Sequence, residues 1–323
     1  MQSNSDSRAE IQIGGQAVIE GVVMRGPEKW ALAVRRPCGD MFVSVNPTST
    51  LAQRYPKWNK FLIRGIFVLA DSLVIGVKSL SISGAISLEE EPPARAEAGS
   101  LELTGEEHKA LSGAAMAFAM LMALGLFLGL FIVLPAVIAK SLDKYISSTV
   151  VYNLIEGGIR VAVFVGYLAL MGFLPDIRRV FAYHGAEHKV VHTYEAGQPL
   201  TPESAARFST AHMRCGTAFI MIVLILSVLV FSLMGRPALW LRIVERLAII
   251  PLVAAFSYEI IKFAGKYENA LAMKVLMAPG LLLQRLTTRP PDDSQLEVAI
   301  EALNAALGDE TPAAVPSPAP ARA

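Results

Sequence analysis

The residues best suited to chemistry are gathered in one stretch of this chain of 323 residues. Four of its five histidines lie between residues 181 and 217, together with glutamates and one of only two cysteines. Imidazole, carboxylate and thiolate are the groups that bind zinc and related divalent ions. We therefore predict a divalent metal site, with zinc as the first choice. The candidate ligands are His184, His188, His192, His212 and Cys215, with Glu195 beside them.

The spacing of the first three histidines limits how they could share an ion. They recur every four residues, so on a helix they lie roughly along one face. His184 and His188 are one turn apart and can hold one ion. His192 is eight residues from His184, about 12 Å along a helix axis. Either the helix breaks, or His192 serves a second ion or supports the ligands of the first.

Two short patterns lie within this stretch. His184-Gly-Ala-Glu187-His188 follows H-x-x-E-H, the inverted zinc-protease pattern, with Glu187 as the candidate general base. His212 and Cys215 are three residues apart and form a second ligand pair. A single histidine here would be explained by a polar, hydrogen-bonded helix in a cytoplasmic loop. So many potential ligands together favour a metal, and leave open whether it is catalytic or structural.

Composition restricts the class of protein. Hydrophobic residues make up 53% of the chain and charged residues only 18%, which is too apolar for an ordinary soluble protein. The net charge of +1 and the lack of a basic face argue against a nucleic-acid partner. Cys38 and Cys215 are far apart and indicate no disulfide framework. The polar N-terminus predicts no cleavable secretory signal.

The N-terminal region reads as short β-strands between residues 11 and 45. Residues 30–34 and 41–45 flank a predicted hairpin turn at 35–40. Before them, the glycine-rich segment 13–27 predicts tight turns or close backbone approach. Glu20 and Arg25 are its polar groups that could reach a site, although the pattern alone favours Glu20 as a solvated strand carboxylate.

Four apolar segments are predicted to span a membrane: 112–139, 159–174, 217–234 and 247–263. Glu259 lies near one end of the last. Basic residues favour both termini and the histidine-rich loop in the cytoplasm, although loop 235–246 carries three arginines on the outer side. Helix 62–88 has a polar seam of Arg64, Asp71 and Lys78, which favours an interfacial or re-entrant helix over a spanning one.

We therefore expect an α-helical polytopic membrane protein with a small β-containing region. Its predicted parts are a cytoplasmic β-rich region 1–60, an amphipathic or re-entrant helix 61–88, a flexible linker 89–111, a four-span membrane domain 112–263 with the cytoplasmic histidine-rich loop 175–216, a cytoplasmic helical region 264–308 and a disordered tail 309–323. The expected location is the inner (plasma) membrane, which the chain would cross several times.

Several long blocks resemble the YqhQ-like bacterial membrane proteins, a family of unknown function described as predicted metal-dependent enzymes. The blocks are IGGQAVIEGVVMRGP (13–27), RGIFVLADSLVIGVKSL (64–80), FAYHGAEHKVVHTYE (181–195), STAHMRCGTAF (209–219) and QRLTTRPPDDSQLEVAIEAL (284–303). The resemblance implies a membrane location and a metal role for the histidine-rich stretch. It also implies that Glu20 and Arg25 belong to a site. It does not imply a substrate.

These observations favour a membrane-bound, metal-dependent hydrolase acting at the cytoplasmic surface. His184 and His188, with His212 or Cys215, would hold the ion, and Glu187 would act as base. Glu20 is a second candidate catalytic residue, and Arg25 and Arg214 are candidate substrate-binding residues. A lipid head group or a juxtamembrane peptide would suit the location.

Two alternatives remain. One is a membrane scaffold or regulator with a structural ion. The other, a metal or proton transporter, is disfavoured because the predicted spans contain few acids and histidines. The bilayer is the expected partner, and a homo-oligomer is left open.

Overall fold

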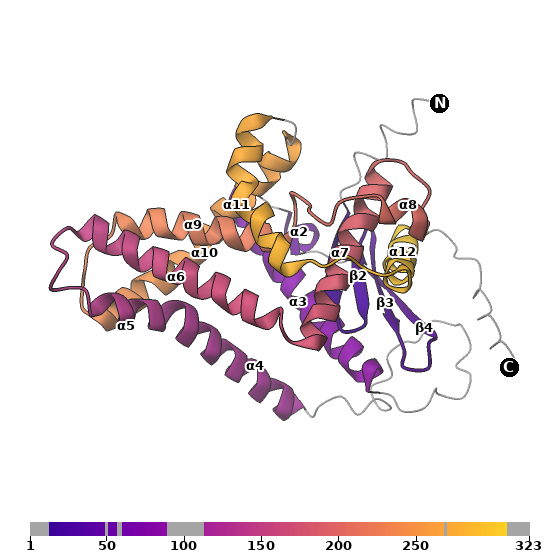
Figure 1. The fold of residues 1–323 in the computed structure, drawn as a ribbon, viewed down its shortest axis with the longest axis horizontal. Helices are drawn as coiled ribbons and strands as arrows, with labels where there is room; N and C mark the ends of the chain where they lie inside the picture. The colour runs from indigo at the N-terminus through magenta and orange to yellow at the C-terminus, as the bar shows by residue number, and fades with distance from the viewer. Residues whose placement is uncertain (1–12, 49–50, 57–59, 89–112, 268–269, 309–323) are drawn as a thin grey trace, which may run out of the picture.

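The computed structural model describes residues 13–48, 51–56, 60–88, 113–267 and 270–308. It consists of a small sheet with its covering helices at one end and an elongated helical bundle at the other (Figure 1). The expectations for the first ten residues, for the linker 89–111 and for the tail 309–323 lie outside the described residues.

The N-terminal region forms a four-stranded antiparallel sheet in the order β1-β2-β3-β4. The strands are β1 (Gly14–Val18), β2 (Gly21–Arg25), β3 (Lys29–Arg35) and β4 (Met41–Pro47). Arg35 pairs with Met41, so the predicted hairpin turn between them is confirmed. Cys38 lies exposed in this turn.

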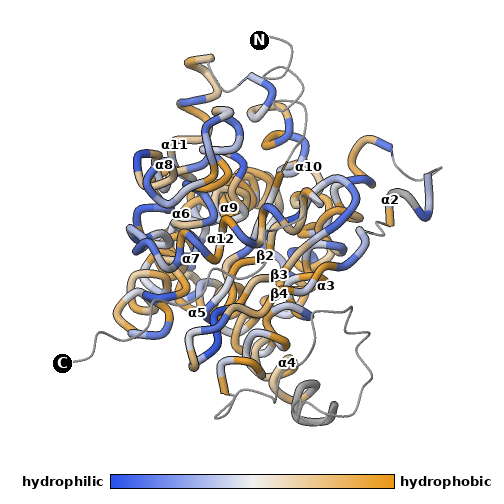
Figure 2. Tube along the Cα trace, turned by 90° about the vertical axis from the view of Figure 1, so that its right-hand side faces the viewer, coloured by the Kyte–Doolittle hydropathy of each residue, from blue (hydrophilic) through white to orange (hydrophobic). Residues whose placement is uncertain are grey.

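Both faces of the sheet are covered by helices (Figure 2). One face packs through Val22 and Met24 against α7 (Pro175–Glu195) and α12 (Asp293–Leu307). The other packs through Val23 and Leu32 against α3 (Ile63–Ser87). Successive strand side chains point to opposite faces, so alternate residues enter the two cores. The sheet and helices far along the chain therefore form one body.

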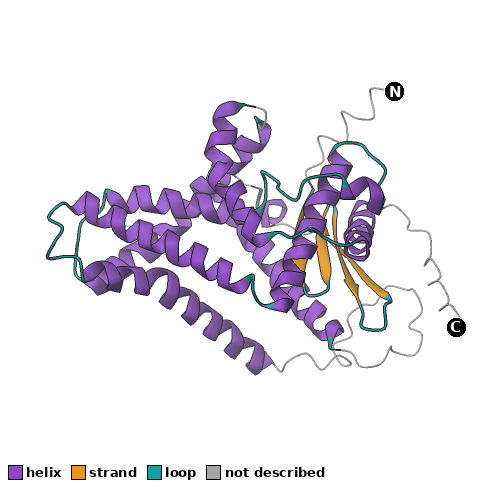
Figure 3. Cartoon of the chain, viewed as in Figure 1, coloured by secondary structure: helices purple, strands orange, loops and turns teal. Residues whose placement is uncertain are grey.

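The bundle contains α4 (Gly113–Leu128), a π-helical turn (Gly129–Val133), α5 (Leu134–Lys140), α6 (Thr149–Met171), α9 (Gly216–Ser232) and α10 (Leu239–Lys266). The loops 141–148 and 233–238 lie together at the end away from the sheet (Figure 3). The remaining helices are α2 (Leu51–Arg54), α8 (Pro202–Ala206) and α11 (Leu271–Thr287).

Among the described residues, four helices are long and apolar enough to cross a membrane: Ile63–Ser87, Phe118–Lys140, Thr149–Met171 and Leu239–Lys266. The expected mostly helical protein with candidate spans and a small N-terminal sheet is thus confirmed. The helix α9, predicted as a span, is apolar but only 17 residues long. The helix α3, predicted to lie at the interface, meets the criteria of length and composition.

The polar seam of α3 is satisfied within the protein. The buried Asp71 carboxylate accepts a hydrogen bond of 3.0 Å from the Leu51 backbone N–H. The Arg64 guanidinium forms an ion pair with Glu259 of α10. Lys78 lies over the Trp30 ring on the sheet. The seam is therefore a packing surface, which explains how an apolar helix carries these charges.

The predicted starts of two membrane segments are wrong, because α6 and α10 begin more than two helical turns earlier. Arg242 and Arg246 lie inside α10 rather than in an outer loop, and both are buried. Arg160 is buried as well, and its Nη2 atom lies 3.1 Å from a carboxylate oxygen of Glu156. Glu156 also pairs with Arg246 and lies 3.9 Å from Arg242. The buried Glu156 carboxylate compensates the charges of Arg242 and Arg246, which the charge pattern predicts to lie in an outer loop.

Candidate metal centre

The helix α7 positions most of the candidate ligands. It runs unbroken from Pro175, a residue suited to the first helical turn, to Glu195. Tyr183, Ala186 and Val190 bury its apolar side against the sheet core. The histidines occupy the neighbouring face, one helical turn apart. Because the helix does not break, the eight-residue separation of His184 and His192 prevents both from binding one ion.

The described residues contain two groups whose ligand atoms lie within 4.8 Å of one another. The first consists of His184, His188 and Cys215, and we call it the first ligand group. The second, here the second ligand group, consists of His192, Glu195 and His212. His212 therefore does not join His184 and His188, and Cys215 takes the third position.

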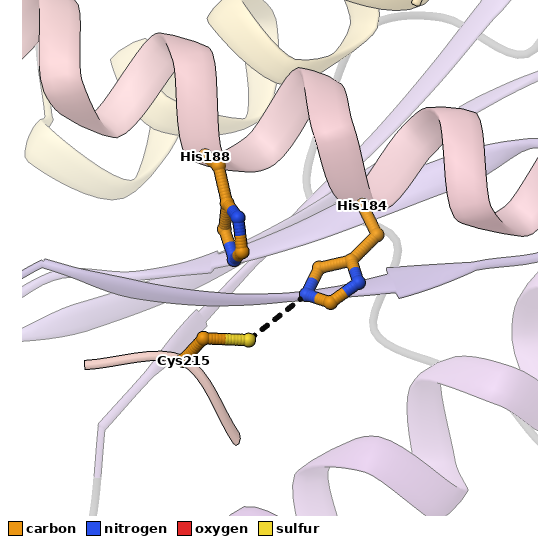
Figure 4. Close-up of side chains that lie close together, drawn as sticks. All are labelled: His184, His188 and Cys215. Atoms are coloured by element: carbon orange, nitrogen blue, oxygen red, sulfur yellow. Dashed lines mark hydrogen bonds between the residues drawn. The ribbon is translucent and has the colours of Figure 1, made fainter. Parts of the chain in front are cut away.

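In the first ligand group, two imidazoles descend from α7 toward the sulfur at the start of α9 (Figure 4). The His184 Nε2 atom lies 3.2 Å from Cys215 Sγ, and the rings of His184 and His188 are 4.4 Å apart. Two ligands of one tetrahedral zinc, with Zn–S of ~2.3 Å and Zn–N of ~2.0 Å, lie roughly 3.5 Å apart. The distance between His184 Nε2 and Cys215 Sγ is therefore close to that between two ligands of one zinc ion.

Backbone carbonyls fix the direction of both imidazoles. His184 Nδ1–H donates to the Thr287 carbonyl at 2.9 Å, and His188 Nδ1–H donates to the Thr210 carbonyl at 2.5 Å. Since a carbonyl can only accept, each Nδ1 carries the proton, and in the neutral ring each Nε2 has a lone pair, which in His184 faces Cys215 Sγ. Metal-binding histidines are commonly held in this way. Both rings are therefore set in the tautomer that a metal requires.

One buried nitrogen in this group lacks a hydrogen-bond partner, namely His188 Nε2. His188 is only 2% exposed, and its burial lowers the pKa of the imidazole, an effect partly opposed by Cys215. A buried polar atom without a partner is costly, and a bound ion would satisfy it. These residues fit a divalent ion with two nitrogen ligands and one sulfur ligand.

The second ligand group is already engaged by protein partners. His192 Nε2 lies 2.9 Å from the Ala211 carbonyl, and His212 Nε2 lies 3.4 Å from a Glu195 oxygen. Glu195 also forms an ion pair with Arg214. Because its polar atoms have partners in the protein, this group needs no ion to be satisfied. We regard the first ligand group as the stronger candidate.

Glu187 lies on α7 against Gly15 of β1. A Cβ atom at Gly15 would come within 2.8 Å of the Glu187 side chain, so only glycine allows this approach. Burial raises the pKa of Glu187, while His184, His212 and the Gly15 N–H oppose the increase. Its Oε2 atom is buried without a hydrogen-bond partner. This carboxylate is suited to accept a proton close to both ligand groups.

Two other predicted site residues lie outside both ligand groups. Glu20, in the turn between β1 and β2, makes a double hydrogen bond to Arg179 at 2.5 Å and accepts one from the Tyr183 hydroxyl at 3.3 Å. It therefore ties the sheet to the first turns of α7. Arg25 ends β2, where it is paired with Gly14 of β1 and Trp30 of β3.

The sequence analysis did not identify the residues that hold the ligand residues in place by hydrogen bonds. The buried Gln284 side chain of α11 accepts from the His212 N–H and donates to the His212 carbonyl, both at 2.8 Å. Thr287 and Thr210 contribute only their carbonyl oxygens. Backbone acceptors leave no trace in residue type. The one available signal was the QRLTT segment (284–288), whose polar residues end an apolar helix.

Gly185 lets the 287–290 segment cross α7 beside His184. The Arg289 N–H donates to the Phe181 carbonyl at 2.9 Å, and a Cβ atom at Gly185 would overlap the Arg289 carbonyl oxygen. We expect Gly185→Ala to lower the free energy of unfolding by about 1–3 kcal/mol, measured by thermal unfolding in detergent. Gly158→Ala is the control, because a Cβ atom there meets nothing within 4 Å. Unchanged melting of Gly185→Ala would contradict the close crossing.

Comparison with known proteins identifies a family and a relative of this chain. Residues 61–309 match the family described as "Protein of unknown function (DUF1385)". The chain belongs to this family. It is also 34% identical over 307 residues to "Uncharacterized protein YqhQ" of Bacillus subtilis (strain 168), covering 91% of this chain and 92% of that protein. The resemblance to YqhQ-like proteins is thus confirmed. No solved structure is significantly similar to the chain.

Proposed function

We propose that the chain is a membrane-bound, metal-dependent hydrolase that acts at the cytoplasmic surface of the membrane. The observation that carries the proposal is the pair of imidazoles whose Nδ1 atoms are fixed by carbonyls and whose Nε2 atoms face Cys215. Three protein ligands are typical of catalytic zinc sites, which keep a fourth position for water or substrate. A closed structural site would need a fourth protein ligand.

Each residue has a defined part in this proposal. His184, His188 and Cys215 would hold a divalent ion such as Zn²⁺, which when bound supplies Lewis-acid activation of water and substrate. Glu187, buried next to the ligands, would accept a proton at its carboxylate, and burial raises its pKa, which makes it a stronger base. Gly15 holds this carboxylate in place through its N–H.

The helical bundle indicates where the proposed reaction would take place. Candidate spans α6 and α10 both end on the side where α7 and the sheet lie (Figure 1). The proposal puts the membrane boundary at these helix ends, beside the first ligand group. Loops near that boundary carry Arg207, Arg214 and Arg289, whereas the loops 141–148 and 233–238 at the far end carry Lys144 and Arg236. This difference favours a cytoplasmic position. A substrate at the bilayer surface would then lie close to the first ligand group.

The test uses zinc-loaded protein in mixed micelles with panels of phospholipids and membrane-anchored peptides, with products followed by mass spectrometry. We expect turnover of at least one class, lost on chelation and restored by zinc. Glu187→Gln should keep the ion and lose about 10²–10⁴-fold in rate. Full activity of Glu187→Gln would remove its role as base. Fully loaded protein that releases no product from any panel would contradict the hydrolase.

A structural ion in a non-enzymatic scaffold is the second candidate. It is favoured by the way the first ligand group joins α7, the start of α9 and the Thr287 carbonyl at the end of α11. Under this alternative, chelation would lower the melting temperature sharply and release the segment 209–215 to proteolysis. Under the enzymatic proposal, chelation stops turnover while that segment stays protected.

A further inference from the structure

A pocket of about 600 Å³ lies next to the second ligand group, between α3, α10 and the segment before α9. Its lining includes four basic residues and a single acidic one. The basic residues are Arg64, Arg214, Lys262 and Lys266, and the acidic residue is Glu259. Glu259 and Glu195 pair with the two arginines, so the excess positive charge lies on Lys262 and Lys266. Such an excess in a concave site attracts anions.

The two arginines are held in place before any ligand arrives. Arg64 Nε donates to Glu259 at 2.7 Å, and Glu259 also accepts from the Leu62 N–H at 3.3 Å. Arg214 rests on Gly265, where a Cβ atom would come within 3.0 Å of its Cδ atom, and it pairs with Glu195. Planar guanidinium groups fixed in this way suit the oxygens of phosphate.

The rest of the lining matches the membrane boundary. Phe61 and Phe263 are 62% and 55% exposed at the pocket, and Lys262 and Lys266 lie exposed in the last turns of the candidate span α10. Aromatic rings gather at the level of lipid head groups, and lysines near helix ends reach toward them. The pocket thus combines anion-binding groups with a rim suited to acyl chains.

We infer that this pocket binds a phosphate-bearing anion, with the head group of an anionic lipid as its source. The inference deepens the proposed function by naming the substrate class. Arg214 carries the connection, because it lines the pocket and pairs with Glu195 of the second ligand group. A head group bound there lies beside the second ligand group, and Arg214 directly precedes Cys215 of the first ligand group in the chain.

The test measures binding to the full chain in neutral detergent, without added metal and without turnover. Its outcome is therefore separate from that of the hydrolase assay. Short-chain phosphatidic acid, phosphatidylcholine of the same chain length and inorganic phosphate are each titrated, and the ligand-induced rise in melting temperature is recorded. The variants are Lys262→Gln with Lys266→Gln, and as a matched control Lys140→Gln with Lys144→Gln, which removes two exposed lysines near the opposite end of the bundle.

We expect phosphatidic acid to bind the wild type and the control pair equally. The pocket pair should bind about 30-fold more weakly, since each basic residue near an anionic lipid contributes about fivefold. Phosphatidylcholine should bind weakly to all. If inorganic phosphate binds as tightly as phosphatidic acid and with the same dependence on the lysines, the phosphate site stands and its source is soluble. Binding that is equal in the pocket pair and the control pair overturns the inference.

Discussion

Replacing His188 by alanine is expected to remove the bound ion while leaving the protein folded. His188 supplies one of three ligand atoms, and its Nε2 atom has no other hydrogen-bond partner. Loss of groups that only support a ligand weakens metal binding by about 10–100-fold, so loss of the ligand itself should exceed 100-fold. Metal content after dialysis, measured by plasma mass spectrometry on protein of native melting behaviour, checks this expectation.

His192→Ala is the matched control, because it removes an imidazole from the same helix one turn further on. His192 belongs to the second ligand group, which has its own protein partners. The ion should therefore remain in His192→Ala. If His192→Ala loses the ion and His188→Ala keeps it, the assignment of the metal to the first ligand group is wrong.

The largest effect on stability is expected from Glu156→Gln in the membrane bundle. Glu156 is fully buried and is the carboxylate that faces Arg160, Arg242 and Arg246. Removing one partner of a buried ion pair leaves uncompensated charge and costs about 3–5 kcal/mol. Thermal unfolding in detergent should show a melting temperature well below that of the wild type.

Glu245→Gln provides the comparison, since it removes the same charge from α10 next to Arg246 at a half-buried position. Its effect should stay within about 1 kcal/mol. Equal melting of Glu156→Gln and the wild type would show that water or lipid, rather than Glu156, compensates the three arginines.

Much of the fold could be predicted because strong periodic signals govern it. The hairpin at residues 35–40 follows from two strand patterns around turn residues. The apolar helices follow from length and hydropathy alone. The starts of α6 and α10 were missed because Glu156, Arg160, Arg242 and Arg246 read as surface charges. Only their mutual pairing in three dimensions makes them compatible with a buried helix.

The candidate ligands could also be found from residue type and spacing, but their grouping could not. The sequence left the third ligand open between His212 and Cys215, since both lie in a segment without periodic structure. The Gln284 side chain, far along the chain, holds the backbone of His212, and Cys215 forms the cap of α9. The partner of Glu20 could not be found from the sequence for the same reason, because Arg179 is 159 residues further along the chain.

The most direct test of the metal centre is the absorption spectrum of cobalt-substituted protein. Cobalt(II) takes the place of zinc in such sites and reports its ligands and geometry. We predict a thiolate-to-cobalt charge-transfer band and tetrahedral d–d bands in the wild type, with the charge-transfer band lost in Cys215→Ser and retained in His192→Ala. Cobalt that binds without a thiolate band, or no tight cobalt binding at all, would contradict an ion held by His184, His188 and Cys215.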